Sequence, residues 1–296
     1  MAEFRSSAMF DVTGWRVVVT GGGSGLGRII AKTFLVNGAS SVTLIDILQE
    51  RLEDAVKEFS SIKKDLGLKG DVHVVQGDVA SRDGIASVVS KVRNLGMGID
   101  TLVLAAGIRR VNKKTFSPGL GLSKLVEAVQ SLDWDDMEAS FRINVFSQYY
   151  LTAGLLDLIG ESAAKQSGKG SVICFSSVAS KHTGQFVPAY QTSKAAVDQL
   201  VKIMAAECAD LYIRVNAISP GLFPSNMNPM DPKHPDSNMR YAKEMPARRP
   251  GTEQEIASTA LYLASPAGFY VTGQNIRVDG GRLLVAAGKI LVREDE

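Results

Sequence analysis

Short runs of apolar and β-branched residues alternate along the chain with longer stretches in which apolar residues recur at helical spacing. The short runs predict strands, and the amphipathic stretches predict the helices that connect them. We expect strands at 16–20, 41–46, 71–76, 101–105, 171–175, 214–218 and 275–278, and helices at 25–36, 49–59, 85–95, 134–159, 189–208 and 253–263. Continuously apolar strands that each lead into a helix are typical of a parallel sheet covered on both faces, so the expected fold class is α/β with one doubly wound sheet.

Two stretches interrupt this alternation. Residues 109–132 form a connection that is longer than usual and has a short helical piece in its second half. Residues 220–250 hold seven of the ten prolines, and because proline lowers the entropy lost on ordering, we interpret this stretch as a substrate lid. A mobile surface loop is the alternative. One domain is expected over 12–288, between an N-terminal tail at 1–11 and a charged C-terminal tail at 289–296.

The composition is that of an ordinary globular chain, with 45% hydrophobic residues, 22% charged residues and a formal net charge of +2. Since this small net charge implies no strong electrostatic field, nucleic acid and anionic membranes are poor candidate partners. No apolar run approaches the roughly 18 residues of a membrane helix, and the chain does not open on a signal peptide, so a cytoplasmic location is expected. Cys174 and Cys208 are expected to be buried free thiols, and the three histidines lack the spacing of a metal site.

A glycine-rich turn joins the first expected strand to the first expected helix. The residues from Gly21 to Gly27 include five glycines, which let the backbone turn tightly and approach a ligand closely. The start of the following helix offers free N–H groups and a partial positive charge to a pyrophosphate. In this position the turn predicts a dinucleotide site, and a flexible turn is the alternative.

Asp46 ends the second expected strand and bears on the choice between the two nicotinamide dinucleotides. An acidic residue here can accept hydrogen bonds from the ribose hydroxyls of adenosine, and its charge would repel a 2′-phosphate. No basic residue lies next to it in the sequence, and the closest candidate, Arg28, lies just inside the first helix. We therefore expect NAD(H), with a helix N-cap as the alternative role of Asp46.

Ser177, Tyr190 and Lys194 form the candidate catalytic set. Tyr190 and Lys194 are four residues apart on an expected helix and so share one face, and Ser177 follows the fifth expected strand. A free phenol has a pKa of about 10, which is too high for proton transfer near neutrality, and a neighbouring ammonium lowers that pKa. The spacing alone arises easily by chance, so the hypothesis depends on its place in a sheet that begins with a dinucleotide turn. A capping serine, a core tyrosine and a solvated lysine are the alternatives.

These residues together resemble the short-chain dehydrogenase/reductase family, from about Val12 to Arg282. The motifs that carry the resemblance are Thr20-Gly21 through Gly25 and Gly27, Asp78-Val79, Asn144, Ser177, Tyr190-Gln191-Thr192-Ser193-Lys194, Pro220-Gly221, Thr272–Gln274 and Asp279–Gly281. Several matches in order are far more specific than any one of them. The chain departs from the family pattern at Leu104-Ala105-Ala106-Gly107, where two asparagines are usual, at Ser180 in place of glycine, and at Ser225 in place of threonine.

The resemblance implies a Rossmann fold and a hydride transfer between NAD(H) and a ketone or secondary alcohol. It makes Tyr190 the general acid or base, Lys194 the residue that lowers its pKa and holds the nicotinamide ribose, Ser177 the ligand of the substrate oxygen, and Asn144 the anchor of a water. The cofactor contacts it implies are Gly21, Ser24, Gly25, Leu26, Gly27, Asp46, Asp78, Val79, Ala106, Gly107, Tyr190, Lys194, Pro220, Gly221, Leu222 and Ser225. It also implies a homo-oligomer, tetramer or dimer.

The substrate pocket has less specific signals. Ser177, Tyr190, Phe186, Phe223 and Met227 are the candidate substrate contacts, with core or lid packing as an equal alternative for the last three. A medium-sized, mostly apolar carbonyl compound or alcohol is the expected substrate.

Three charged or titratable residues near the same edge are weaker candidates. Arg109 and Arg110 follow the fourth expected strand and could meet an anionic group of the substrate, although a solvated position is favoured. His182, between Ser177 and Tyr190, could line the mouth of the pocket, although a surface position is favoured. Two other functions stay open: a dinucleotide-binding sensor or scaffold without turnover, and an enzyme of this fold with non-redox chemistry.

Overall fold

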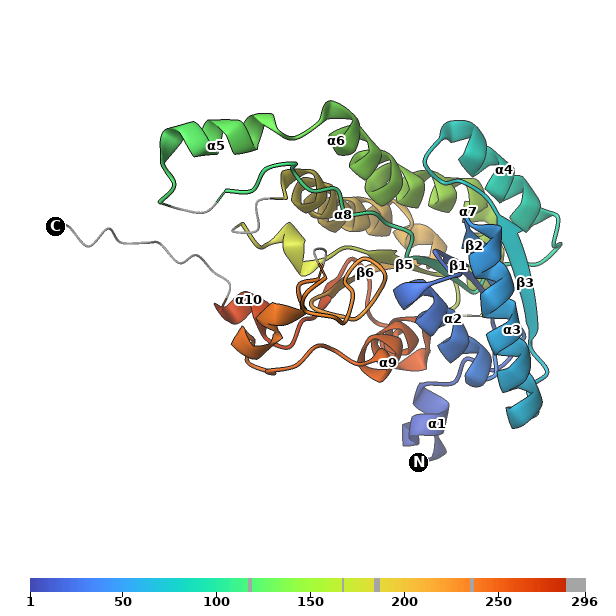
Figure 1. Ribbon diagram of the computed structural model, residues 1–296. Coiled ribbons are helices and arrows are strands. Elements are labelled where there is room, and N and C mark those ends of the chain that lie inside the picture. Colours follow the sequence, from blue (N-terminus) through green and yellow to red (C-terminus); the bar gives the residue numbers. More distant parts are fainter. Residues whose placement is uncertain (117–118, 167, 184–186, 235–236, 286–296) are drawn as a thin grey trace.

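The computed structural model describes residues 1–296 except 117–118, 167, 184–186, 235–236 and 286–296. Its centre is a parallel sheet whose strand order is β3-β2-β1-β4-β5-β6-β7 (Figure 1). The strands are β1 (Arg16–Thr20), β2 (Ser41–Asp46), β3 (Asp71–Gln76), β4 (Thr101–Leu104), β5 (Ser171–Phe175), β6 (Arg214–Pro220) and β7 (Asn275–Val278). The order reverses between β1 and β4, which places a switch point, and hence a ligand crevice, at the carboxyl ends of these two strands.

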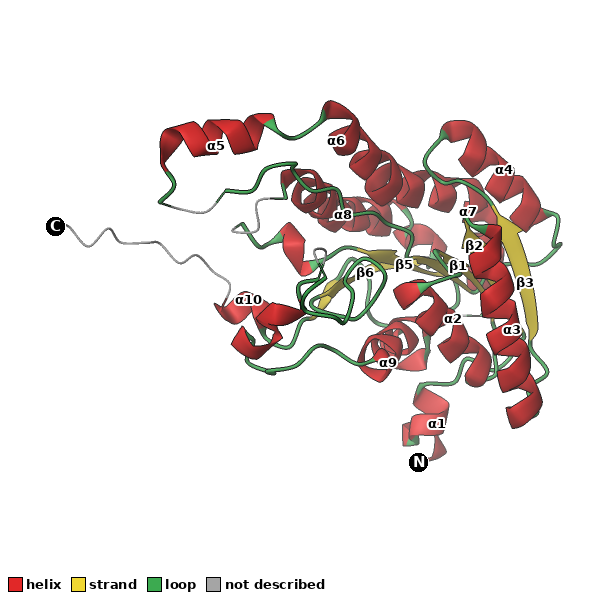
Figure 2. Cartoon of the chain, viewed as in Figure 1, coloured by secondary structure: helices red, strands yellow, loops and turns green. Residues whose placement is uncertain are grey.

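Helices cover both faces of the sheet (Figure 2). The α-helices are α1 (Ser6–Met9), α2 (Gly25–Val36), α3 (Gln49–Leu66), α4 (Arg82–Arg93), α5 (Gly121–Gln130), α6 (Trp134–Phe141), α7 (Ser147–Lys165), α8 (Pro188–Glu207), α9 (Glu253–Ala264) and α10 (Arg282–Val285). Single turns or short 3-10 helices are η1 (Ala2–Phe4), η3 (Val178–Ser180), η4 (Ala209–Leu211), η5 (Met239–Glu244) and η6 (Pro266–Gly268), and η2 (Arg142–Phe146) is a π-helical turn. The architecture confirms the doubly wound α/β fold expected from the sequence.

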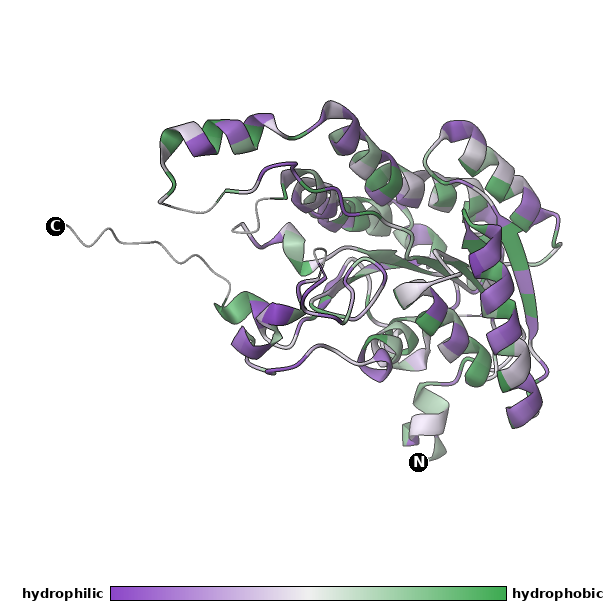
Figure 3. Cartoon of the chain, viewed as in Figure 1, coloured by the Kyte–Doolittle hydropathy of each residue, from purple (hydrophilic) through white to green (hydrophobic). Residues whose placement is uncertain are grey.

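The side chains of each strand alternate between two apolar clusters, one on each face of the sheet. In β1, Val17 and Val19 pack with side chains of α2, α3 and α9, whereas Val18 packs with those of α4, α7 and α8. Phe34 of α2 and Leu155 of α7 are completely buried, and such burial contributes roughly 1.5–3 kcal/mol for each side chain. The central strands β1, β2, β4, β5 and β6 are therefore buried, whereas the edge strands β3 and β7 are partly exposed. The covering helices carry both hydrophilic and hydrophobic residues along their length (Figure 3).

Some helix and strand ends differ from those expected. The helix expected at 49–59 continues to Leu66 and ends where Gly67 adopts a left-handed backbone with φ of 64°, a common helix stop. The single helix expected at 134–159 is divided into α6, the π turn η2 and α7. Two helical turns occupy the expected N-terminal tail, and its Phe10 packs against the core.

The two long connections have defined structure over their described residues. In the first, Asn112 Nδ2 donates to the main-chain oxygen of Ala128 at 3.0 Å, which ties the connection to α5. In the second, buried Asn228 donates to the oxygen of Phe223 and accepts from the nitrogen of Asn238. Asn228 therefore ties two parts of the segment 220–250 together, and its role as a lid stays a prediction. Within the described part of the chain, no helix combines the length and apolar character needed to cross a bilayer.

Candidate active site

The glycine turn lies at the switch point, and two of its glycines are required by the space around them. Gly21 has φ of 65°, and a Cβ there would lie 3.1 Å from the main-chain nitrogen of Ala106 at the end of β4. A Cβ on Gly27 would lie 2.3 Å from the oxygen of Gly21. Side chains at these positions would push the turn away from β4 or away from α2, so glycine keeps the crevice narrow and its backbone accessible.

The start of α2 has the properties of an anion site. Ser24 is the N-cap residue, its side chain makes no capping hydrogen bond, and the first turn contains no acidic residue. The first N–H groups and the helix dipole are thus available to a diphosphate. Ser225 approaches from the segment 220–250, since a Cβ on Gly25 would lie 3.7 Å from Ser225 Cβ. These residues fit a dinucleotide diphosphate held against the turn.

Asp46 ends β2 beside this turn. Its Oδ2 accepts a hydrogen bond of 3.2 Å from the nitrogen of Gly23, and its Oδ1 accepts one of 3.2 Å from the nitrogen of Leu48. Arg28 points to α3, where it pairs with Glu58 at 2.6 Å. The carboxylate is therefore held next to the glycine turn, while the arginine considered as a possible counter-charge is engaged elsewhere.

The sequence reading missed a second basic residue near this carboxylate. A Cβ on Gly23 would lie 2.9 Å from Arg51 Cβ and 3.0 Å from Asp46 Oδ2. Arg51, the third residue of α3, therefore lies at the same glycine. The residues between Asp46 and Arg51 in the sequence gave no signal of this closeness, which is visible only in the folded chain.

The other expected cofactor contacts lie at the same edge or beside it. Asp78 is exposed and its Oδ1 accepts from the nitrogen of Ala80, whereas the side chain of Val79 is buried with α4 and leaves only its backbone to face a ligand. Gly221 follows β6, and a Cβ there would lie 2.7 Å from Asp279 Cα. The oxygen of Leu222 accepts from Gly251.

Ser177, Tyr190 and Lys194 come together at the end of β5. Tyr190 and Lys194 lie on one face of α8, and the Lys194 Nζ is 5.6 Å from the centre of the Tyr190 ring. Nζ donates a hydrogen bond of 2.8 Å to the main-chain oxygen of Phe175, and the side chain of Ser177 is hydrogen-bonded to Tyr190. The end of the strand thus holds both the ammonium and the serine hydroxyl near the phenol.

The pKa of Tyr190 does not shift in the direction expected from the sequence. Burial raises the pKa of Tyr190, and the hydrogen bond with Ser177 and the positive charge of Arg109 only partly offset this effect. Burial also lowers the pKa of Lys194 to about 8. The net direction for Tyr190 is therefore opposite to the lowered pKa expected from its lysine neighbour, because removing the phenolate from water outweighs the stabilising charges.

Asn144 closes the back of the site from the π turn η2. Its Nδ2 donates to the oxygen of Ile108 at 2.9 Å and to Ser193 Oγ at 3.0 Å, and its Oδ1 accepts from the nitrogen of Ile108 at 2.9 Å. A Cβ on Gly107 would lie 3.1 Å from Asn144 Oδ1 and 3.5 Å from Lys194 Nζ. The backbone of Ala106 and Gly107, which forms one wall of the site, therefore lies next to the candidate catalytic residues. π turns such as the one that carries Asn144 are frequent at functional sites.

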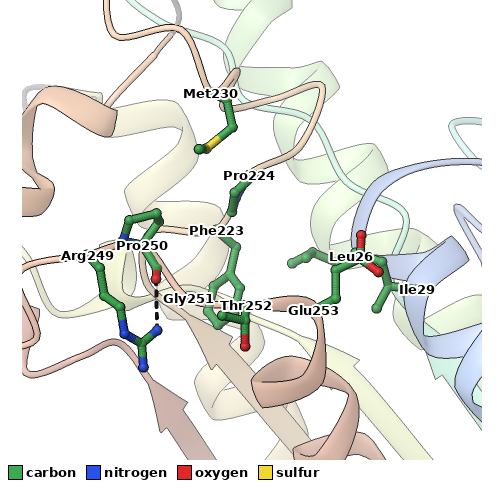
Figure 4. Close-up of a pocket in the computed structure, with 10 residues that line it drawn as sticks. All are labelled: Leu26, Ile29, Phe223, Pro224, Met230, Arg249, Pro250, Gly251, Thr252 and Glu253. Carbon is green, nitrogen blue, oxygen red and sulfur yellow. Dashed lines mark hydrogen bonds between the residues drawn. The ribbon is translucent and has the colours of Figure 1, made fainter.

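The expected substrate contacts have different outcomes. Phe223 is 5% exposed and its ring packs over Gly251, with Ile256 and Ala260 in the same apolar cluster. It lines a cavity of about 410 Å³ with Leu26, Ile29, Pro224, Met230, Arg249, Pro250, Thr252 and Glu253 (Figure 4). Phe223 thus packs in the apolar core and also borders this cavity, and its contact with a substrate stays a prediction. Met227 is half-buried, and Phe186 lies outside the described residues.

The structure also distinguishes the weaker candidate residues from one another. Arg110 is exposed and pairs with Asp136 at 3.4 Å, as expected for a solvated arginine. Arg109 is partly exposed, and its charge reaches Tyr190, which brings it closer to the chemistry than expected. His182 is 8% exposed, so the expectation of a surface histidine is wrong; burial and the charge of Arg282 lower its pKa. Cys174 and Cys208 are buried and free, as expected.

Comparison with known proteins agrees with this geometry. A family profile described as Enoyl-(Acyl carrier protein) reductase matches residues 21–282. The short-chain dehydrogenase/reductase PhomF of Diaporthe leptostromiformis is 32% identical over 94% of each chain. The chain belongs to the short-chain dehydrogenase/reductase family. It is therefore an oxidoreductase of this family, and the resemblance read from its motifs is confirmed.

Solved short-chain dehydrogenase/reductase structures share the fold over nearly the full length. The Pseudomonas aeruginosa RhlG/NADP active-site complex has a TM-score of 0.75 and 30% identity, and the match covers 92% of this chain and 98% of that one. A 3-oxoacyl-[acyl-carrier protein] reductase with bound NAD from Brucella melitensis has a TM-score of 0.75 and 26% identity, with coverage of 95% and 97%. Because both dinucleotides occur among these relatives, family membership implies a nicotinamide dinucleotide without deciding which one.

Proposed function

We propose that this protein transfers a hydride between NAD(H) and a ketone or secondary alcohol, with Tyr190 as the proton donor in reduction and the proton acceptor in oxidation. The observation that carries the proposal is the convergence of Ser177, Tyr190 and Lys194 on the wall of Gly107, at the switch point that also holds the glycine turn. A dinucleotide held along that turn reaches this wall with its nicotinamide end.

Each residue of the set has one task in reduction. The nicotinamide, when bound, supplies the hydride. Ser177 orients the substrate oxygen by a hydrogen bond, and Tyr190 donates its proton to that oxygen. The raised pKa of Tyr190 keeps the phenol protonated near neutrality, which suits this direction. Lys194 places a positive charge beside the phenolate that remains after proton transfer, so its ammonium form is the active one.

The carboxylate of Asp46 supports NAD(H) as the cofactor. It lies at the glycine turn with one edge bonded to Gly23, in a position to accept hydrogen bonds from the adenosine ribose. A 2′-phosphate would bring negative charge next to it. Arg51 lies close enough to the same glycine to moderate this preference, so we propose that the NADH preference is finite.

Our proposals for the substrate class and for the oligomeric state rest on fewer observations. We propose a medium-sized, mostly apolar carbonyl substrate under the segment 220–250, which contributes half-buried Met227. We also propose association of identical chains, since α7 exposes the neighbouring rings of Tyr149 and Tyr150. Light scattering after size-exclusion chromatography measures the number of chains directly.

Turnover of NADH with a panel of ketones tests the function. Wild-type protein is expected to consume NADH with some members of the panel, and Tyr190→Phe to abolish this turnover while NADH still binds with similar affinity. Tyr270→Phe is the matched control, because Tyr270 is fully exposed. Full activity in Tyr190→Phe would refute the proton-transfer role, and tight NADH binding without turnover on any substrate would favour a sensor or scaffold.

A further inference from the structure

The face of α8 that carries Tyr190 and Lys194 continues with an acidic residue. Asp198 lies four residues after Lys194 and is 7% exposed. Its Oδ1 accepts a hydrogen bond of 2.6 Å from Ser176 Oγ and another from Asn275 Nδ2 at the start of β7. Its Oδ2 lies 3.2 Å from the Nζ of Lys181. Because a buried carboxylate is costly without partners, these contacts from three separate segments mark a defined position rather than a solvated helix residue.

Asp198 completes a register between strand β5 and helix α8. Phe175 accepts from Lys194 through its main-chain oxygen, Ser176 donates to Asp198, and Ser177 is hydrogen-bonded to Tyr190. Three consecutive residues at the end of β5 thus contact three residues of α8 that follow one another at intervals of about one helical turn. Ser176 Oγ also lies 3.0 Å from the main-chain oxygen of Lys194, so Asp198 and Lys194 share this serine.

Asp198 also places a negative charge near a buried ammonium. Burial lowers the pKa of Lys194 to about 8, and the charge of Asp198 acts in the opposite direction. Cys174 acts in the same direction as Asp198, but burial raises the pKa of its thiol to about 12, so it is neutral in the physiological range. The ionised group that opposes the loss of the Lys194 proton is therefore Asp198.

Several other charged groups on the elements packed against α8 have partners of their own. Lys181 follows η3 and faces Asp198, and Arg109 acts on Tyr190. The remaining pairs are Asp136 of α6 with Arg110, Glu138 of α6 with Arg142 of η2, and Arg214 of β6 with the main-chain oxygens of Leu263, Ala264, Gly268, Val271 and Gly168.

We propose that Asp198 is a positioning residue of the active site, which holds the Ser177 segment against α8 and keeps Lys194 in its ammonium form. The inference rests on the proposed function, because it concerns the same proton-transfer set. It adds a residue outside the Tyr-x-x-x-Lys motif and outside direct reach of the substrate oxygen.

Asp198→Asn is the primary test. The amide oxygen can still accept from Ser176 and Asn275, but the charge is lost. The Lys194 pKa is expected to fall by about one unit, the order of effect of a nearby opposite charge. NMR of lysine labelled with ¹³C at Cε measures it, with the Lys194 signal assigned from Lys194→Met. The alkaline limb of kcat/KM for ketone reduction should move to lower pH by the same amount, whereas a purely structural role would lower kcat without moving the limb.

Lys181→Gln probes the same carboxylate from its outer side. The Lys181 side chain is 62% exposed, so this variant is expected to fold. Without its positive partner, Asp198 should act more strongly on Lys194, and the Lys194 pKa is expected to rise. Opposite shifts in the two variants support the proposal. An unchanged Lys194 pKa in Asp198→Asn, or no rise in Lys181→Gln, overturns it, and Lys181→Gln decides alone if Asp198→Asn does not fold.

The NMR titration separates this inference from the proposed function. If the wild-type protein has no turnover on any carbonyl compound, the proposed function fails, but the Lys194 pKa in the two variants still reports on the role of Asp198. If turnover is present and the Lys194 pKa does not respond, the function stands and the role of Asp198 is refuted.

Discussion

The side-chain amide of Asn144 binds the main chain of Ile108 through both of its ends, donating to the oxygen and accepting from the nitrogen at 2.9 Å each. Asn144 is completely buried in a π turn, whereas Ile108 lies in the loop that leaves β4. The contact fixes the wall at Gly107 and the direction in which Arg109 leaves it. A helix irregularity and a loop are thus joined at the one place where the expected dinucleotide and substrate meet.

Replacement of Asn144 by alanine should weaken both the fold and the activity. The change leaves two main-chain groups of Ile108 without their partner, at a cost of about 2–4 kcal/mol in the free energy of unfolding. The kcat for ketone reduction is expected to fall at least about tenfold, as a displaced wall misaligns the reactants. Urea denaturation and steady-state kinetics measure the two effects. Asn37→Ala, which removes an exposed side-chain hydrogen bond at the end of α2, should leave kcat unchanged.

The proposed NADH preference should depend on Asp46 and Arg51 in opposite directions. Removal of the carboxylate in Asp46→Asn removes the repulsion of a 2′-phosphate, so the ratio of kcat/KM for NADH to that for NADPH is expected to fall at least about tenfold, a change of roughly 1.4 kcal/mol. Adding Arg51→Gln to this variant removes the neighbouring positive charge and should restore part of the ratio. Kinetics with both cofactors measure it. A ratio that Asp46→Asn does not alter would contradict the position assigned to the ribose.

Arg109 and Arg110 form a matched pair for testing charge near the phenol. The positive charge of Arg109 lowers the pKa of Tyr190, so Arg109→Gln should raise that pKa further. Alcohol oxidation needs the phenolate, and its acidic limb should therefore move to higher pH, by about half a unit or more. Arg110→Gln removes a charge that pairs with Asp136 at the surface and should leave the limb in place. Equal shifts in both variants would show that overall charge, rather than the position of Arg109, is responsible.

Asp100 should control stability in acid. Burial opposes its ionisation, but the hydrogen bonds from Arg16 and the charges of Lys169 and Arg16 outweigh burial and hold its pKa below the ordinary 3.8. A lowered folded-state pKa contributes stability that is present above the unfolded value and lost as pH falls from about 4 through the folded value. Asp100→Asn should therefore cost about 3 kcal/mol at neutral pH and flatten the pH dependence of unfolding below pH 4. Urea denaturation at several pH values measures this, with exposed Asp65→Asn as the control.

Local patterns were sufficient for the sheet and for the glycine turn. Helix α2 and strands β1, β2, β3, β5 and β7 have the bounds expected from their hydrophobic periods. These elements begin and end at turn residues or where the spacing of apolar residues changes. Residues that are close in the sequence therefore determine their bounds. The Tyr190–Lys194 spacing likewise places both side chains on one face because the helix geometry is fixed.

Contacts between distant residues account for what the sequence left out. The π turn at Arg142–Phe146 has no glycine or proline to mark it, and the bonds of Asn144 to Ile108 and Ser193 become visible only in three dimensions. His182 reads as a polar loop residue but is covered in the folded chain. Phe223 reads as a pocket aromatic, yet Gly251 leaves room for its ring in the core.

The strand–helix register at the end of β5 has a consequence for changing what the protein accepts. Since Tyr190, Lys194 and Ser177 lie between β5 and α8, substitutions in 220–250 are expected to leave their spacing intact. Within that segment Asn228 donates to the oxygen of Phe223, and Gly251 directly after it leaves room for the Phe223 ring. Under the proposed function, the recognition of new substrates is therefore separable from the hydride and proton transfer, and libraries confined to this segment are the economical way to redirect the enzyme.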